Sequence, residues 1–203
     1  MDFKELFNQC WKIFVANLPV LILLTFVYVI VSVVSLGIMG PVLTAGYMQS
    51  LLLLVREGHK PKIRDLFSQM RLFFPLLAFM LLVVVVVSIG FGILVIPGIA
   101  AVIALAFFCL YMLPLMTDQG LGLIEALKTS SRMAMNPPVG EHITVVIVFL
   151  VLSSIGNSTG IGVLFTQPFA TIFVLLFYEQ KRQRLLSSPG MRVNNGPPPP
   201  PEQ

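Results

Sequence analysis

Charged residues are confined to four segments of this sequence, and the segments between them are long and uncharged. The chain carries 13 Lys and Arg and 9 Asp and Glu. The charges fall within residues 2–12, 56–71, 118–141 and 179–203. The uncharged intervals are residues 13–55, 72–117 and 142–178. Because a charge at the centre of a bilayer costs at least about 2.5 kcal/mol on insertion scales, this spacing indicates an integral membrane protein.

The overall composition agrees with this class. Hydrophobic residues make up 57% of the chain and charged residues 11%, whereas soluble domains carry about 25% charged residues. The net charge of +4 and the pI near 9.3 would also suit a nucleic-acid-binding protein. However, the basic residues flank apolar segments, where the positive-inside rule places them. We therefore expect the lipid bilayer as a partner and no nucleic acid.

Each uncharged interval has glycine or proline near its middle, which marks a turn. The signals are Gly37 to Pro41, Gly90 to Gly98, and Gly156 to Gly162. One membrane span needs about 20 apolar residues, so each interval has room for two. The sequence predicts an all-α polytopic protein with six transmembrane helices, arranged as three hairpins. The predicted spans are residues 18–38, 41–56, 74–92, 97–116, 143–157 and 161–178.

The distribution of basic residues predicts the orientation of these spans. None of the three hairpin turns on the far side carries Lys or Arg. The positive-inside rule then places both termini and both charged loops in the cytoplasm, and we expect a multi-pass protein of the bacterial cytoplasmic (inner) membrane. The alternative of five spans would leave Lys181, Arg182 and Arg184 outside the cell. Asp2 and Glu5 are untypical of a signal peptide, so we expect the N-terminal segment to be retained.

Residues 2–14 are predicted to form an amphipathic helix at the cytoplasmic interface. Its apolar face comprises Phe3, Leu6, Phe7, Cys10 and Phe14. The alternative is an extension of the first span.

A similar design recurs along the chain and suggests a threefold internal repeat. Glu5 to Gln9 reads ELFNQ, Asp65 to Gln69 reads DLFSQ, and Glu125-Ala126-Leu127 follows in phase. The repeating unit would be an interfacial helix followed by a two-helix hairpin. Chance likeness between short amphipathic segments is the alternative.

Polar residues inside the predicted spans are candidates for binding a substrate. Gln49, Asn157 and Gln167 could line a path for a neutral solute or a lipid if they converge. The alternative is that such groups form hydrogen bonds between helices.

No pattern of catalytic or metal-binding residues is found in the sequence, so we expect no enzymatic activity, cofactor or metal. His59 and His142 are predicted to be surface residues, and Cys10 and Cys109 to be unpaired thiols. Asp118 and Glu125 are the two acids beside a span that merit consideration. We interpret them as a helix corner, because an acid in the first turn of a helix is favoured by the helix dipole.

The chain is predicted to divide into a membrane domain at residues 1–186 and a disordered cytoplasmic tail at residues 187–203. The tail contains five consecutive prolines at 197–201, which favour a polyproline II conformation. It is either a solvated tail or a docking peptide for a protein partner. The spans offer a second surface for a partner or for homo-oligomer formation.

Two stretches resemble a family of uncharacterised bacterial six-span inner-membrane proteins. The first is Gly40-Pro41-x-Leu43-x-Ala45-Gly46, where x is any residue. The second is Pro97-Gly98-Ile99 followed by an apolar span, then Asp118-Gln119-Gly120 and Glu125-Ala126-Leu127-Lys128-x-Ser130. This family is related to the glycerophosphoryl diester phosphodiesterase membrane domain. The resemblance implies a six-helix membrane fold. It brings no established activity, and we expect the phosphodiesterase domain itself to be absent.

The sequence thus leads to two functional hypotheses. The first is a non-enzymatic scaffold or accessory factor in the cell envelope. The alternative is a transporter or lipid-handling protein. Proton- or ion-coupled transport normally uses carboxylates within the membrane, and the predicted spans have none, so the transported molecule would be a neutral solute or a lipid. An enzyme ranks third.

Overall fold

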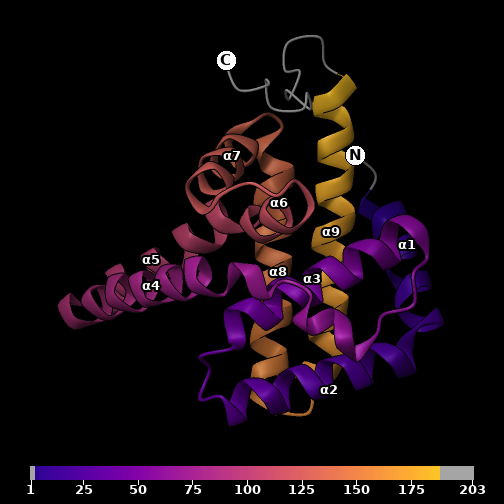
Figure 1. The fold of residues 1–203 in the computed structure, drawn as a ribbon. Coiled ribbons are helices and arrows are strands. Elements are labelled where there is room, and N and C mark those ends of the chain that lie inside the picture. The colour runs from indigo at the N-terminus through magenta and orange to yellow at the C-terminus, as the bar shows by residue number, and fades with distance from the viewer. Residues whose placement is uncertain (1–2, 188–203) are drawn as a thin grey trace, which may run out of the picture.

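The structure is a computed structural model that describes residues 3–187 (Figure 1). Within these residues all regular elements are helices, so the predicted all-α class is confirmed. The predicted proline-rich tail lies outside the described residues beyond Ser187.

Helices α1 (Phe3–Ala16) and α2 (Leu18–Val34) meet at a bend of 82°. Pro19 has no backbone N–H with which to continue the hydrogen bonding of α1, so a bend here is expected. The α1 helix is amphipathic as predicted, with Leu6, Cys10 and Phe14 buried. Its exposed face includes Trp11, which is 53% exposed.

Helix α3 (Gly40–Glu57) lies in the interior of the molecule. Ten of its residues are buried: Val42, Leu43, Ala45, Gly46, Tyr47, Met48, Ser50, Leu51, Leu52 and Leu54. The helix ends at Gly58, whose φ of 66° is the left-handed conformation that glycine adopts readily. Gly46 faces the backbone of Leu66, and a Cβ atom at position 46 would lie 2.1 Å from the Leu66 carbonyl oxygen.

Two short 3₁₀ helices, η1 (Ile63–Phe67) and η2 (Met70–Leu72), follow α3, and η1 packs against it. Asp65 holds this segment in place. Its carboxylate accepts hydrogen bonds from the Lys62 backbone N–H at 2.9 Å and from the Ser50 hydroxyl of α3 at 3.1 Å.

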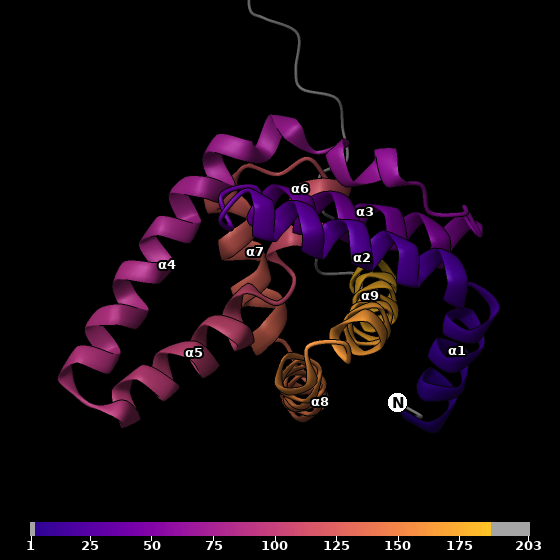
Figure 2. The ribbon, with the colours of Figure 1, turned by 90° about the horizontal axis from the view of Figure 1, so that it is seen from below.

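Helices α4 (Phe73–Ile93) and α5 (Val95–Cys109) form a long hairpin, which we call the α4–α5 arm. It projects away from the remaining helices (Figures 1 and 2). The two helices approach closely near the tip, where a Cβ atom on Gly90 would lie 3.1 Å from the Cα of Gly98.

Helices α6 (Met112–Asp118) and α7 (Leu123–Met135) form a compact pair beside the base of the arm. The predicted span at residues 97–116 is therefore interrupted, between α5 and α6. Pro114 explains the interruption, because it lacks the N–H that would bond to the Leu110 carbonyl four residues earlier. Gly120, with a φ of 66°, reverses the chain towards α7.

Helices α8 (Val139–Thr159) and α9 (Val163–Ser187) form the third hairpin. Gly156 permits their close approach, since a Cβ atom there would lie 2.0 Å from the Thr166 hydroxyl oxygen. In Figure 2 these two helices are seen end-on, whereas α2, α3, α4 and α5 extend across the view. The hairpins therefore cross one another instead of forming a bundle of parallel helices.

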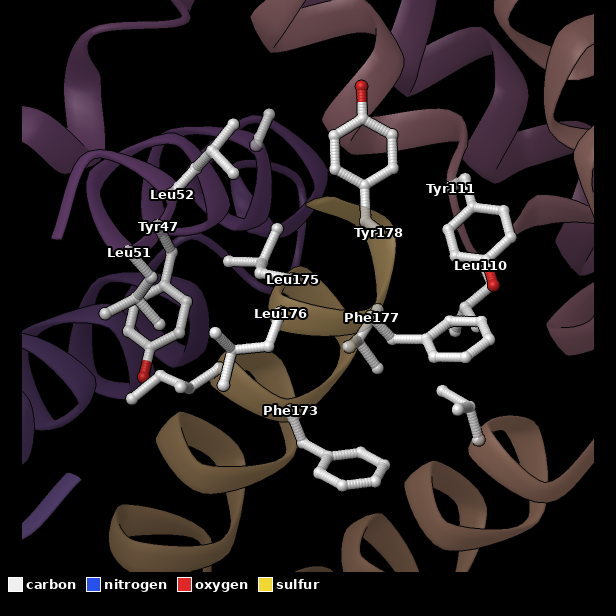
Figure 3. Packing of buried hydrophobic residues seen from close by; sticks show 14 of the residues in the cluster. Tyr47, Leu51, Leu52, Leu110, Tyr111, Phe173, Leu175, Leu176, Phe177 and Tyr178 are labelled. Carbon is white, nitrogen blue, oxygen red and sulfur yellow. The ribbon is translucent and has the colours of Figure 1, made fainter. Parts of the chain in front are cut away.

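Helix α9 is the centre of the core. All residues from 168 to 178 are buried, which is the pattern of a helix surrounded on every side. Helices α1, α2, α3 and α8 pack against it. Figure 3 shows Leu175 and Leu176 on the side of Tyr47 and Leu51, and Phe177 directed towards Tyr111.

The described part of the chain has four helical segments that are long and apolar enough to cross a membrane. They are Ile63–Ile93, Val95–Asp118, Val139–Thr159 and Val163–Arg184. The bent pair α1 and α2 makes a fifth if it is counted as one span. The segment predicted as a span at residues 41–56 forms α3, which is not among them.

The threefold repeat is not confirmed by the structure. The elements before the first and third hairpins, α1 and α7, are amphipathic α-helices. The corresponding middle segment forms η1 and η2 instead. The bond from the Lys62 N–H to Asp65 caps this short 3₁₀ turn.

Candidate functional site

Charged residues from three separate segments of the sequence meet at one end of the molecule. Arg56 lies in the last turn of α3, Asp118 ends α6, and Glu179 lies towards the C-terminal end of α9. The Arg56 guanidinium donates to both Asp118 oxygens, at 2.5 Å from Nη1 and 2.8 Å from Nη2. It also donates to Glu179 Oε1, at 2.7 Å from Nε. One arginine thus connects α3, α6 and α9.

Tyr178 and Arg182 complete this group, and Gln119 adjoins it through Tyr178. The Tyr178 hydroxyl donates to Asp118 at 3.2 Å, and the Gln119 amide donates to the Tyr178 oxygen at 3.3 Å. Arg182 lies 3.8 Å from Asp118 and 3.9 Å from Glu179. We call Arg56, Asp118, Tyr178, Glu179 and Arg182 the ionic cluster.

The ionic cluster is neutral overall and partly shielded from solvent. Two arginines face two carboxylates, and the Asp118 side chain is 10% exposed. Its bidentate pair with Arg56 has the geometry in which guanidinium–carboxylate bonds are strongest. Because the carboxylates are largely buried, removing one partner would leave the other unpaired at a considerable cost.

A second polar group lies at the interruption between α5 and α6. His142 Nε2 lies 2.8 Å from the Phe107 carbonyl oxygen, and His142 Nδ1 lies 2.7 Å from the Tyr111 hydroxyl. A carbonyl can only accept, so Nε2 carries a proton. In the neutral imidazole Nδ1 then accepts from Tyr111.

Ser130 of α7 completes this second group. Its hydroxyl donates to the Phe108 carbonyl at 2.6 Å and accepts from the Tyr111 backbone N–H at 3.2 Å. These backbone groups would pair within a continuous helix, and the interruption releases them. His142, Tyr111 and Ser130, which we call the His142 cluster, therefore satisfy the exposed backbone groups of a broken helix.

The prediction of a surface position for His142 is wrong, because its exposed fraction is 0%. The sequence contains a signal that could have revealed this. His142, Val145, Val146 and Phe149 share one helical face of α8, and the first three are buried. Tyr111 and Tyr178, which lie towards the ends of two predicted spans, are likewise fully buried.

Lys181 lies between the two clusters. It is 7% exposed, and its ammonium group donates to the Asn136 carbonyl at 3.3 Å. The same group lies 6.0 Å from the centre of the Tyr111 ring, within range of a cation–π interaction. Lys181 thus extends the polar network from α9 to the end of α7.

The predicted helix corner is confirmed in part. Glu125 lies in the first turn of α7 and is exposed, as expected for an acid at a helix N-terminus. Asp118 has an additional role that the sequence did not indicate, since it binds Arg56. In the sequence, Arg56 is one of the basic residues that flank apolar segments, and no local pattern indicates a particular carboxylate as its partner.

The three candidate substrate residues lie in different environments. Gln49 of α3 is half-buried, Gln167 of α9 is half-buried, and Asn157 of α8 is exposed near the α8–α9 turn. The structure shows no hydrogen bond between any two of them. The Gln49 side-chain oxygen is buried without a hydrogen-bond partner. A role in substrate binding stays a prediction for all three.

Cys10 and Cys109 are unpaired thiols, as predicted. Among residues 3–187, no group of three or more His, Cys, Asp or Glu side chains has a geometry suited to a metal ion. His59 lies 3.4 Å from Asp65, a contact that the sequence spacing did not suggest.

No family model matches this chain, and no curated protein or solved structure shows significant similarity to it.

Proposed function

We propose that this chain is an integral protein of the bacterial cytoplasmic membrane that acts as a non-enzymatic scaffold or accessory factor for a protein partner. The observation that carries this proposal is the ionic cluster, which fixes the ends of α3, α6 and α9 relative to one another. The charged loop at residues 58–71 and the C-terminal end of α9 adjoin it. Together they form a rigid charged face suited to recognition by another protein.

We propose further that six apolar segments enter the membrane as three hairpins whose charged ends face the cytoplasm. Helix α3 fits this arrangement as an interior helix. It is enclosed by protein, so it needs no apolar outer surface for contact with lipid. The relation to six-span proteins with a glycerophosphoryl diester phosphodiesterase membrane domain remains part of this proposal.

The environment of the polar groups supports a structural role over a catalytic one. Both nitrogens of His142 are engaged, and Asp118 is held by Arg56 and Tyr178. A general acid or base must be free to exchange a proton with a substrate. Here a proton transfer would first require these hydrogen bonds to be broken.

The test is purification of the full chain in native nanodiscs, followed by mass spectrometry of whatever remains bound. The proposal predicts a stoichiometric protein partner. Retention of this partner by a chain truncated after Leu186 would assign its binding to the charged face, and its loss with an unchanged melting temperature would assign the binding to the tail. Recovery of a specific lipid or solute without any protein partner would contradict it.

A transporter or lipid-handling protein is the second candidate. It is favoured by the Gln49 oxygen and the Ser153 hydroxyl, both of which are buried without a hydrogen-bond partner. A neutral ligand could supply the missing bond, since unpaired buried polar groups are costly. Gln49→Leu should then reduce binding or flux without lowering stability, and Asn157→Ala and Gln167→Ala test the other two candidate residues in the same way. Unchanged flux in Gln49→Leu would remove this candidate.

A further inference from the structure

We infer that the α4–α5 arm ends within the hydrocarbon layer of the bilayer, so that its tip contacts lipid acyl chains and does not reach the opposite aqueous surface. This inference rests on the membrane location proposed above. The second hairpin would then end inside the bilayer, whereas the third hairpin crosses it.

The chemistry of the tip is the first argument. Residues 89–98 contain no polar side chain. The residues around the turn are nevertheless highly exposed: Ile93 at 67%, Leu94 at 64%, Val95 at 61% and Ile96 at 77%. Four consecutive large apolar side chains at a tip surrounded by water would be unfavourable, at about 25 cal/mol for each Å² exposed.

The turn of the α8–α9 hairpin differs in this respect. The last turn of α8, which leads into it, contains Asn157, Ser158 and Thr159, all of which are exposed. The connection itself is Gly160-Ile161-Gly162, in which Ile161 is 73% exposed. Polar side chains of this kind suit a turn that reaches water. The contrast between the two turns within one molecule indicates that they lie in different surroundings.

The backbone at the tip is also suited to an apolar environment. Only Leu94 separates α4 from α5. Its N–H donates to the Gly90 carbonyl at 3.2 Å, and its carbonyl accepts from the Gly98 N–H at 3.3 Å. Pro97 has no N–H that needs a partner. Both backbone groups of Leu94 are therefore paired, which lowers the cost of placing this residue in hydrocarbon.

The direction of the arm agrees with this position. The arm runs across the axis of α8 and α9 (Figure 2). In Figure 1 its tip, at the left, lies between the level of α7 and the level of the α8–α9 turn at the bottom. If α8 and α9 cross the membrane, the tip lies at an intermediate depth.

The distribution of exposed side chains favours lipid over a second protein chain as the occupant. Val84, Val85 and Val86 are consecutive and are all at least 44% exposed. Because successive residues of a helix are about 100° apart, the apolar exposure extends around more than half of α4. A partner helix would cover one stripe, whereas acyl chains cover all sides.

The experiment is depth-dependent fluorescence quenching of single-tryptophan variants. Trp11 is the one tryptophan of the chain, so Trp11→Phe provides the background. Leu94→Trp is then compared with Ser158→Trp, both at exposed positions, in vesicles of phosphatidylcholine brominated either deep or shallow in the acyl chain. Ile96→Trp provides a second probe of the tip if Leu94→Trp does not fold.

We expect the ratio of deep to shallow quenching to exceed one for Leu94→Trp and to be below one for Ser158→Trp. Equal ratios, both below one, would show that the tip reaches the opposite surface and would overturn the inference. Quenching of Leu94→Trp that increases when the protein is diluted into excess lipid would also overturn it, since a second copy would then be the occupant. If no variant responds to brominated lipid at either depth, the proposed membrane location itself fails.

Discussion

Asp118 is the residue on which the charged end of the molecule depends most. Its carboxylate accepts from Arg56 and Tyr178 and lies near Arg182. A hydrogen bond to a charged group contributes about 1.5–3 kcal/mol, and in this case several share one acceptor. The position of Asp118 at the end of a predicted span suggested a corner, but its function as a connector of three helices became apparent only from the structure.

We therefore predict that Asp118→Asn lowers the free energy of unfolding by about 2 kcal/mol. Thermal unfolding in nanodiscs, followed by circular dichroism, measures the change. Glu125→Gln is the matched control, because Glu125 is exposed at the same corner and should stay within about 0.5 kcal/mol of the wild-type value. Equal losses in the two variants would show that the ionic cluster contributes nothing specific.

His142 allows a similar test of the second polar group. His142→Leu removes the partner of the buried Phe107 carbonyl, and an unsatisfied buried acceptor costs about 1–3 kcal/mol. Tyr111→Phe removes only the Tyr111 hydroxyl that bonds to Nδ1. We expect the double variant to be more stable than the sum of the two single losses predicts. Strictly additive losses would mean that the two side chains do not interact.

At the scale of the elements, the sequence was informative about where helices lie and uninformative about how they cross. The predicted spans at 74–92 and 143–157 lie within α4 and α8, because the exclusion of charge from a span is a local property. The crossing of α3 and α9 depends on pairs such as Arg56 and Glu179, which are 123 residues apart. No local pattern records such a pairing.

The contact between α3 and η1 is a close approach of backbone to backbone, and it predicts a sharp effect of a small substitution. In Gly46→Ala the new methyl group would meet the Leu66 carbonyl, which cannot rotate away. We predict a loss of about 1–3 kcal/mol, as for other overpacked sites, measured by thermal unfolding. Gly140→Ala is the control, because nothing lies within 4 Å of a Cβ atom there. A neutral Gly46→Ala would mean that η1 does not pack on α3 as described.

The whole molecule is organised around α9, which the sequence presented as the last of six equivalent spans. Its residues 168–178 are buried throughout, whereas in α4 the one buried residue is Leu76. Hydropathy would suggest the opposite order, because the mean hydropathy is 3.0 for the segment that contains α4 and 1.2 for α9. Hydropathy does not distinguish contact with protein from contact with lipid. This is why the presence of several apolar helices could be predicted, whereas their number as spans and the arrangement of the core could not.

The same organisation places the charged and uncharged ends of the molecule apart. The ionic cluster lies at the end of α9 that follows Tyr178, and the α8–α9 turn lies before Val163, at the opposite end of the helix. The central claim of this account is that these two ends face opposite sides of a membrane. To test this claim, both native cysteines are first replaced, as Cys10→Ala and Cys109→Ala. A single cysteine is then introduced at one end or the other, so that its labelling reports the side of the membrane on which that end lies.

The most direct measurement is labelling of Lys60→Cys and Ser158→Cys by a membrane-impermeant maleimide in intact cells and in opened cells. The account predicts that Ser158→Cys is labelled in intact cells, whereas Lys60→Cys, in the charged loop after α3, is labelled only after the cells are opened. Labelling of both positions from the same side would contradict it.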